Sequence, residues 1–133
     1  MQPLEKIREK LSAHPELLVR DEGESLTITA SQPHGFDVSF AQDDDGYVVS
    51  FGPWHEHFSQ SDADSALECF AFGLSENSRL RVHSRGGVDY RWTLEALEDG
   101  SWRTYSTTCL LLFPYWRRRN VRYLQNMGGR HGA

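Results

Sequence analysis

The 133-residue sequence has little cysteine and no long apolar run, and each absence excludes a class of protein. Two cysteines, Cys69 and Cys109, are too few for a disulfide framework, so we expect both to be reduced and unpaired. No apolar run reaches 18 residues, which excludes a transmembrane helix. The first residues also lack the apolar stretch of a secretory signal peptide. We therefore expect a cytoplasmic protein.

Motifs that identify a reaction are also missing. The sequence has no Gly-x-Ser-x-Gly nucleophile elbow and no Gly-x-x-x-x-Gly-Lys phosphate loop. The acidic turn at residues 43–46 lacks the carboxylates that an EF-hand requires at its first and last loop positions. The sequence leaves enzymatic activity open and favours a protein without it.

What is present is enough bulky apolar material for one core, with seven Phe, five Tyr and four Trp. Apolar periodicity predicts an α+β single domain over residues 1–126, with a flexible tail at 127–133. The predicted domain has two helices and a mostly antiparallel sheet of about six to seven strands, in the order α-βββ-α-βββ. The helices are expected after Pro3 and after Ser61 or Asp62, and the strands at about 25–30, 36–40, 47–51, 79–85, 88–96 and 102–113, with a last short strand before residue 124.

The turns between strands fix which side chains share a face. In the first hairpin, a turn at residues 43–46 places Phe40 opposite Val49 and Val38 opposite Phe51. In the second hairpin, a three-residue loop at 85–87 keeps apolar and basic side chains on separate faces. We expect one buried face to contain Leu80, Val82, Tyr90, Trp92, Leu94 and Cys109.

The same arrangement predicts a basic outer face made of Arg79, Arg81, His83 and Arg91, with Arg81 opposite Arg91. Charge is divided along the chain, because residues 21–78 hold twelve Asp and Glu but no Lys or Arg. Two interpretations follow. The acidic segment folds over the basic face and neutralises it, or the face is open and an acidic protein partner supplies the missing charge.

A second candidate site is His55-Glu56-His57. In an extended segment both imidazoles point the same way, so they can meet one zinc or other divalent ion. A third ligand would come from His34, His83, Asp62 or Asp64, none of which lies at a diagnostic spacing. The alternative is a loop whose histidines face water and which needs no cofactor.

The run Arg117-Arg118-Arg119 follows Tyr115 and Trp116, a combination that can bind phosphates and stack on bases. A net charge of −5 argues against nucleic acid and favours a protein surface. In element order and size the chain is loosely similar to bacterial type III secretion chaperones and to some toxin-immunity proteins. That similarity implies a non-enzymatic, protein-binding domain, with a homo-oligomer left open. The alternative is a metal- or small-molecule-binding domain, or an enzyme, that uses His55 and His57.

Overall fold

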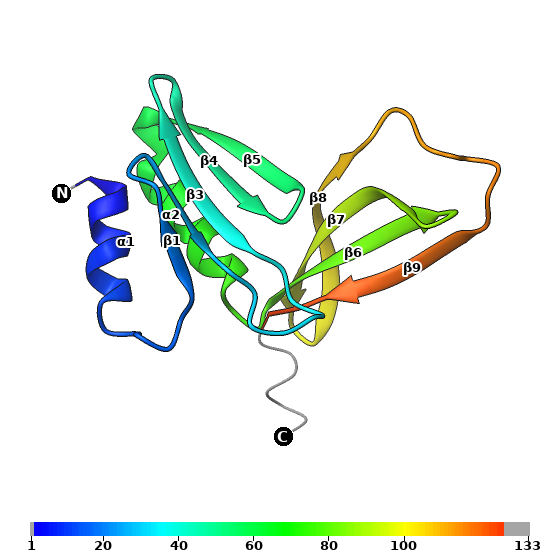
Figure 1. Cartoon of the computed structure of the whole chain (residues 1–133), viewed down its shortest axis with the longest axis horizontal. Coiled ribbons are helices and arrows are strands. Elements are labelled where there is room, and N and C mark those ends of the chain that lie inside the picture. The colour runs from blue at the N-terminus through cyan, green and yellow to red at the C-terminus, as the bar shows by residue number, and fades with distance from the viewer. Residues whose placement is uncertain (1, 127–133) are drawn as a thin grey trace.

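The computed structural model describes residues 2–126, so the tail predicted at 127–133 lies outside the described residues. Within them the chain is α+β, with two antiparallel sheets and two α-helices (Figure 1). The first sheet has the order β1-β2-β3-β4-β5 and the second has the order β8-β7-β6-β9.

The elements follow one another as α1 (Pro3–Leu11), β1 (Val19–Asp21), β2 (Ser25–Ile28), β3 (Val38–Asp43), β4 (Gly46–Phe51), β5 (Trp54–Ser59), a 3₁₀ turn η1 (Gln60–Asp62), α2 (Ala63–Gly73), β6 (Ser78–Arg85), β7 (Val88–Glu98), β8 (Ser101–Cys109) and β9 (Arg119–Leu124). The first sheet is a meander, because each of its strands pairs with the next one in the chain.

The first sheet buries one face, as its alternation predicts. Phe40 lies opposite Val49 and Val38 opposite Phe51, so the predicted register of the first hairpin is confirmed. The helix α2 covers this face, and the Phe70 ring meets the Phe40 ring edge-on at 5.9 Å. Burying such aromatic side chains is a main source of stability in a domain of this size.

The second sheet shares that core through the inner side chains of β6 and β7. Leu80, Val82, Trp92 and Leu94 are buried in one cluster with Phe36, Phe51 and Trp54 of the first sheet and its turns. Trp54 lies between the two sheets. Its ring stacks on Phe51 at 4.8 Å, and its Nε1 donates a hydrogen bond to Ser106 Oγ of β8 at 2.9 Å.

The expectation of one sheet with six to seven strands is wrong, because nine strands form two sheets in the described residues. Two strands, β1 and β5, were not predicted. All residues of β1 are exposed, so it has no apolar alternation to detect. Gly52 and Pro53 end β4 as expected, but they form a tight turn that leads directly into β5 instead of a loop.

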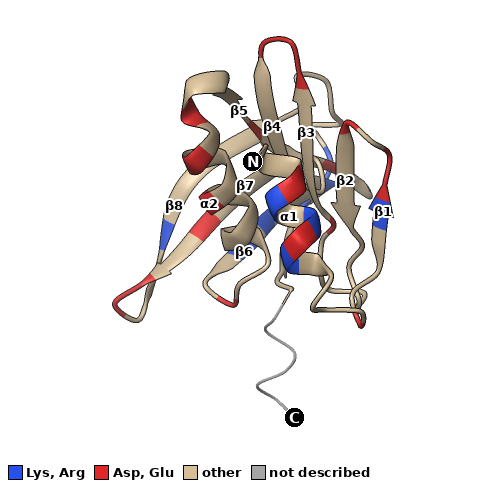
Figure 2. Cartoon of the chain, turned by 90° about the vertical axis from the view of Figure 1, so that its left-hand side faces the viewer, with Lys and Arg blue, Asp and Glu red and all other residues tan. Residues whose placement is uncertain are grey.

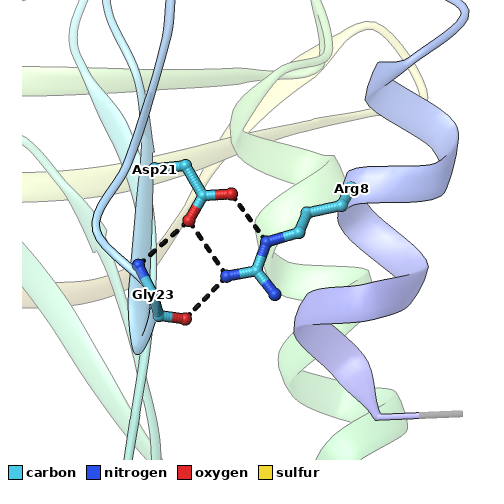
Figure 3. A network of polar contacts seen from close by, with 3 residues as sticks. All are labelled: Arg8, Asp21 and Gly23. Atoms are coloured by element: carbon cyan, nitrogen blue, oxygen red, sulfur yellow. Dashed lines mark hydrogen bonds and ion pairs between the residues drawn. The ribbon is translucent and has the colours of Figure 1, made fainter.

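The helix α1 is held against β1 by a charged contact (Figure 3). Arg8 binds both carboxylate oxygens of Asp21, at 2.6 and 2.9 Å, and donates another hydrogen bond to the carbonyl of Gly23. Asp21 also accepts from the Gly23 amide. The hydrogen bond from Arg8 is the main reason that the pKa of Asp21 is lowered to about 2. This exposed ion pair joins α1 to β1, while the buried side chains of Leu4 and Ile7 anchor α1 in the core.

The role of Trp54 gives a stability prediction. Trp54→Ala removes a fully buried ring and a hydrogen bond between the sheets, so we expect a loss of about 3–5 kcal/mol in the free energy of unfolding. Trp54→Phe keeps most of the packing and should cost less, which keeps the test readable if the alanine variant does not fold.

Trp116→Ala is the matched control, because Trp116 is exposed and makes no core contact. Its effect in urea unfolding should stay within about 0.5 kcal/mol. Equal losses at the two positions would contradict the burial of Trp54 between the sheets.

Candidate functional site

The turn between β6 and β7 differs from the predicted one. Gly86 and Gly87 both have positive φ, 58° and 80°, as a two-residue type I′ turn requires, so Arg85 pairs with Val88. The predicted three-residue loop is therefore wrong. A β-bulge then leaves Tyr90 without a partner in the ladder and shifts the pairing by one residue.

The bulge preserves the separation of faces while changing the partners. Val82 lies opposite Trp92 and Leu80 opposite Leu94, and these four side chains are buried together as predicted. Arg81 lies opposite Thr93, so the expected Arg81–Arg91 pair is wrong. Arg91 instead lies opposite His83.

Two residues leave the predicted buried face. Tyr90 is buried, but outside the core cluster, where its ring stacks on Phe113 at 4.1 Å. Cys109 is exposed and pairs with Arg91, because a second irregularity between Leu94 and Glu95 shifts the β7–β8 register. Both differences come from bulges, which turn a side chain to the other face of a strand.

Glu95 neutralises part of the basic outer face. This buried carboxylate binds Arg79 Nε at 2.6 Å and Arg81 Nη1 at 3.4 Å. The Arg79 guanidinium also lies over the rings of Trp102 and Tyr123, 4.2 Å from each centroid. Sequence reasoning missed Glu95, although its alternation with Leu94 and Ala96 places it on the outer face.

His83 lies at the centre of this face and is only 6% exposed. Burial lowers its pKa, and the charges of Arg81, Arg91, Arg119 and Arg85 lower it further. Its Nδ1 is buried without a hydrogen-bond partner among residues 2–126, as are the Nε atoms of Arg81 and Arg85. The positive field of these arginines favours an anion at the surface of this face.

Arg85 and Arg119 extend the predicted set, because they face each other across β6 and β9 and both act on the pKa of His83. The sequence analysis names Arg119 in its basic run but does not place it beside Arg85, because the pairing of β9 with β6 has no local signal. We call this surface the basic face. It consists of Arg79, Arg81, His83, Arg85, Arg91 and Arg119.

The carboxylates that pair with arginines of residues 79–126 come from that same half of the chain. They are Glu95, with Arg79 and Arg81; Glu98, with Arg103; and Asp89, with Arg122. Acidic residues of the first sheet gather instead at its turns, such as the tip between β3 and β4 (Figure 2). Arg85, Arg91, Arg117, Arg118 and Arg119 make no ion pair with any residue that the structure describes.

Beside the basic face, residues 110–118 form a long connection between β8 and β9, which we call the exposed loop. It projects at the end of the molecule opposite α1 (Figure 1). Four large side chains in it are highly exposed: Leu111 at 93%, Leu112 at 89%, Tyr115 at 72% and Trp116 at 71%.

The exposed loop is nevertheless attached at three points. The Leu110 amide donates to the Tyr90 carbonyl, and the Phe113 ring stacks on Tyr90. Near its end, Arg85 Nη1 donates to the Arg117 carbonyl at 2.9 Å. The structure thus holds the backbone of the loop while its apolar side chains point outward.

His55 and His57, the candidate metal ligands, lie on the same face of the edge strand β5. Their ring centroids are 5.5 Å apart, and both side chains are exposed. Among residues 2–126 no group of three or more His, Cys, Asp or Glu is placed to hold a metal ion. The pair alone supplies fewer ligands than a structural zinc site uses. A metal at this position stays a prediction.

No family model, curated protein or solved structure matches this chain. Among the helices that the structure describes, none is both long enough and apolar enough to cross a membrane.

The two thiols test the strand register next to the exposed loop. Cys109 is exposed, whereas Cys69 is half-buried and unpaired, and burial raises the pKa of its thiol to about 12. Because the thiolate is the reactive form, iodoacetamide at pH 8 should alkylate Cys109 well before Cys69. Peptide mass spectrometry over time measures both rates, and Cys109→Ser should remove the fast reaction. Faster alkylation of Cys69 would contradict the register.

Proposed function

We propose that the chain is a non-enzymatic protein-binding domain that docks an acidic partner on its basic face and exposed loop. The observation that supports this most is a group of five arginines, without a carboxylate partner in the described part of the chain, beside a loop of exposed apolar side chains. The two features are adjacent, because Arg117, Arg118 and Arg119 continue directly from the loop.

The basic face supports an acidic partner on electrostatic grounds. Within residues 2–126, Glu95 is the one acid paired with arginines of the basic face, so a positive charge remains around His83. Carboxylates of a partner can accept charge-assisted hydrogen bonds from the unpaired guanidinium groups, which are about twice as strong as neutral ones. Such complementarity mainly increases the association rate and the specificity of a complex.

The exposed loop supports a partner with an apolar contact surface. Contiguous exposed apolar side chains on a soluble domain commonly mark an interaction site. Tyr, Trp and Arg are the residues most enriched among those that dominate binding energy, and the loop presents all three together. Attachment of the loop through Phe113 and Arg117 reduces the entropy lost when a partner binds.

A protein is favoured over nucleic acid or an anionic membrane for two reasons. The whole chain carries a net charge of −5, which opposes general attraction to a polyanion. The exposed loop also presents Leu111 and Leu112, whose aliphatic side chains fit the apolar surface of a protein.

Calorimetric titration with a synthetic acidic peptide rich in Glu and Leu tests this proposal. Arg91→Gln combined with Arg119→Gln removes two unpaired charges and should weaken binding about tenfold. It should also reduce the dependence of binding on salt. Leu111→Ser combined with Trp116→Ser should weaken binding by a similar factor and leave the salt dependence unchanged.

Arg20→Gln combined with Arg103→Gln is the matched control. It removes two exposed arginines that pair elsewhere, with Glu22 and Glu98, and should leave binding unchanged. A 20-nucleotide oligo(dT) and vesicles of phosphatidylserine and phosphatidylcholine are titrated in parallel. Binding to either of these in place of the peptide, or an equal effect of the control variant, would contradict the proposal.

A further inference from the structure

A second site lies at the other end of the molecule, away from the basic face. A pocket of about 960 Å³ opens between α1 and α2, with the end of β2 and Phe36 contributing to its lining. Its size is at the upper end of the range typical of ligand-binding pockets. Its apolar side chains include Leu11, Leu17, Leu18, Leu67, Phe70 and Leu74.

Residues 2–126 leave the apolar lining of this pocket open. Leu17 and Leu18 are exposed, although they belong to a wall made largely of apolar side chains. Leu4 and Ile7 anchor α1 in the core, and the exposed ion pair of Arg8 with Asp21 joins α1 to β1 (Figure 3). Binding of an apolar group in a preformed apolar pocket is favourable, because it removes apolar surface from water.

The charged residues of the lining indicate which polar group a ligand of this pocket would carry. Lys6 and Lys10 are the only lysines in the sequence, and both line this pocket. They are four residues apart on α1, so they lie on one side of the helix. Neither ammonium makes a hydrogen bond or an ion pair with any residue between 2 and 126.

Glu16 is the acidic residue among those that line the pocket, and it lies 3.6 Å from the ring of His14. Counting Lys6, Lys10 and Glu16, the lining has an excess of one positive charge, which favours an anionic ligand.

From these observations we infer that the pocket binds an anionic amphiphile with a straight apolar chain, such as a medium-chain carboxylate. The chain of the ligand occupies the space between α1 and α2, and its carboxylate faces Lys6 and Lys10. The pocket contains no residue of the basic face. A negative result for ligand binding in the pocket would therefore leave the proposed protein-binding function untouched.

Isothermal titration calorimetry on the full chain with octanoate, decanoate and dodecanoate tests the apolar part. Each pair of added methylenes should tighten binding by more than tenfold, since one buried CH₂ changes an equilibrium constant about fourfold. Ala71→Trp places a ring in the α2 wall at an exposed position and should abolish binding of all three. Circular dichroism verifies that this variant is folded.

The charged part is tested with decanol and with a lysine variant. Decanol lacks the anion and should bind about threefold to tenfold more weakly than decanoate. Lys6→Gln combined with Lys10→Gln should weaken decanoate binding by a similar factor and leave decanol binding unchanged. Arg20→Gln combined with Arg103→Gln is the control for lost positive charge and should change neither.

Three results would overturn the inference: affinity that does not depend on chain length, equal affinity for decanoate and decanol, or no effect of Ala71→Trp. An amphiphile that binds equally well to the Arg91→Gln and Arg119→Gln variant, yet not to Ala71→Trp, places the ligand in the pocket rather than on the basic face.

Discussion

The alternation along β6 is the constraint on which the rest of the structure depends. Its inner residues Leu80 and Val82 complete the aromatic core of the first sheet. Since successive side chains of a strand point to opposite faces, their burial places Arg79, Arg81 and His83 on the other face of the second sheet. The strands β7 and β9 flank β6 and carry further arginines on that side, so one packing requirement creates the basic face.

This arrangement separates charge in space as well as in sequence. The carboxylates that neutralise arginines of the second sheet come from that sheet, chiefly the buried Glu95. The acidic turns of the first sheet lie elsewhere (Figure 2). The molecule therefore has two contrasting ends, a basic face with an apolar loop and an apolar pocket bordered by two lysines.

Sequence periodicity predicts the parts of the fold in which one face is buried. The β3–β4 register and the burial of Leu80, Val82, Trp92 and Leu94 follow from alternation alone. The β6–β7 partners do not, because a bulge adds a residue that no local pattern reveals. The pairing of β9 with β6 and the pocket between α1 and α2 depend on tertiary packing, so sequence reasoning identifies neither.

The pKa of His83 tests most directly whether the basic face is left without a covering acid. A two-dimensional NMR titration of its imidazole should give a pKa below the ordinary 6.5, because burial and nearby arginines both disfavour its charged form. Arg91→Gln should raise that pKa toward the ordinary value. A pKa above 6.5 in the unmodified chain would mean that a carboxylate lies over the face, and it would contradict this account.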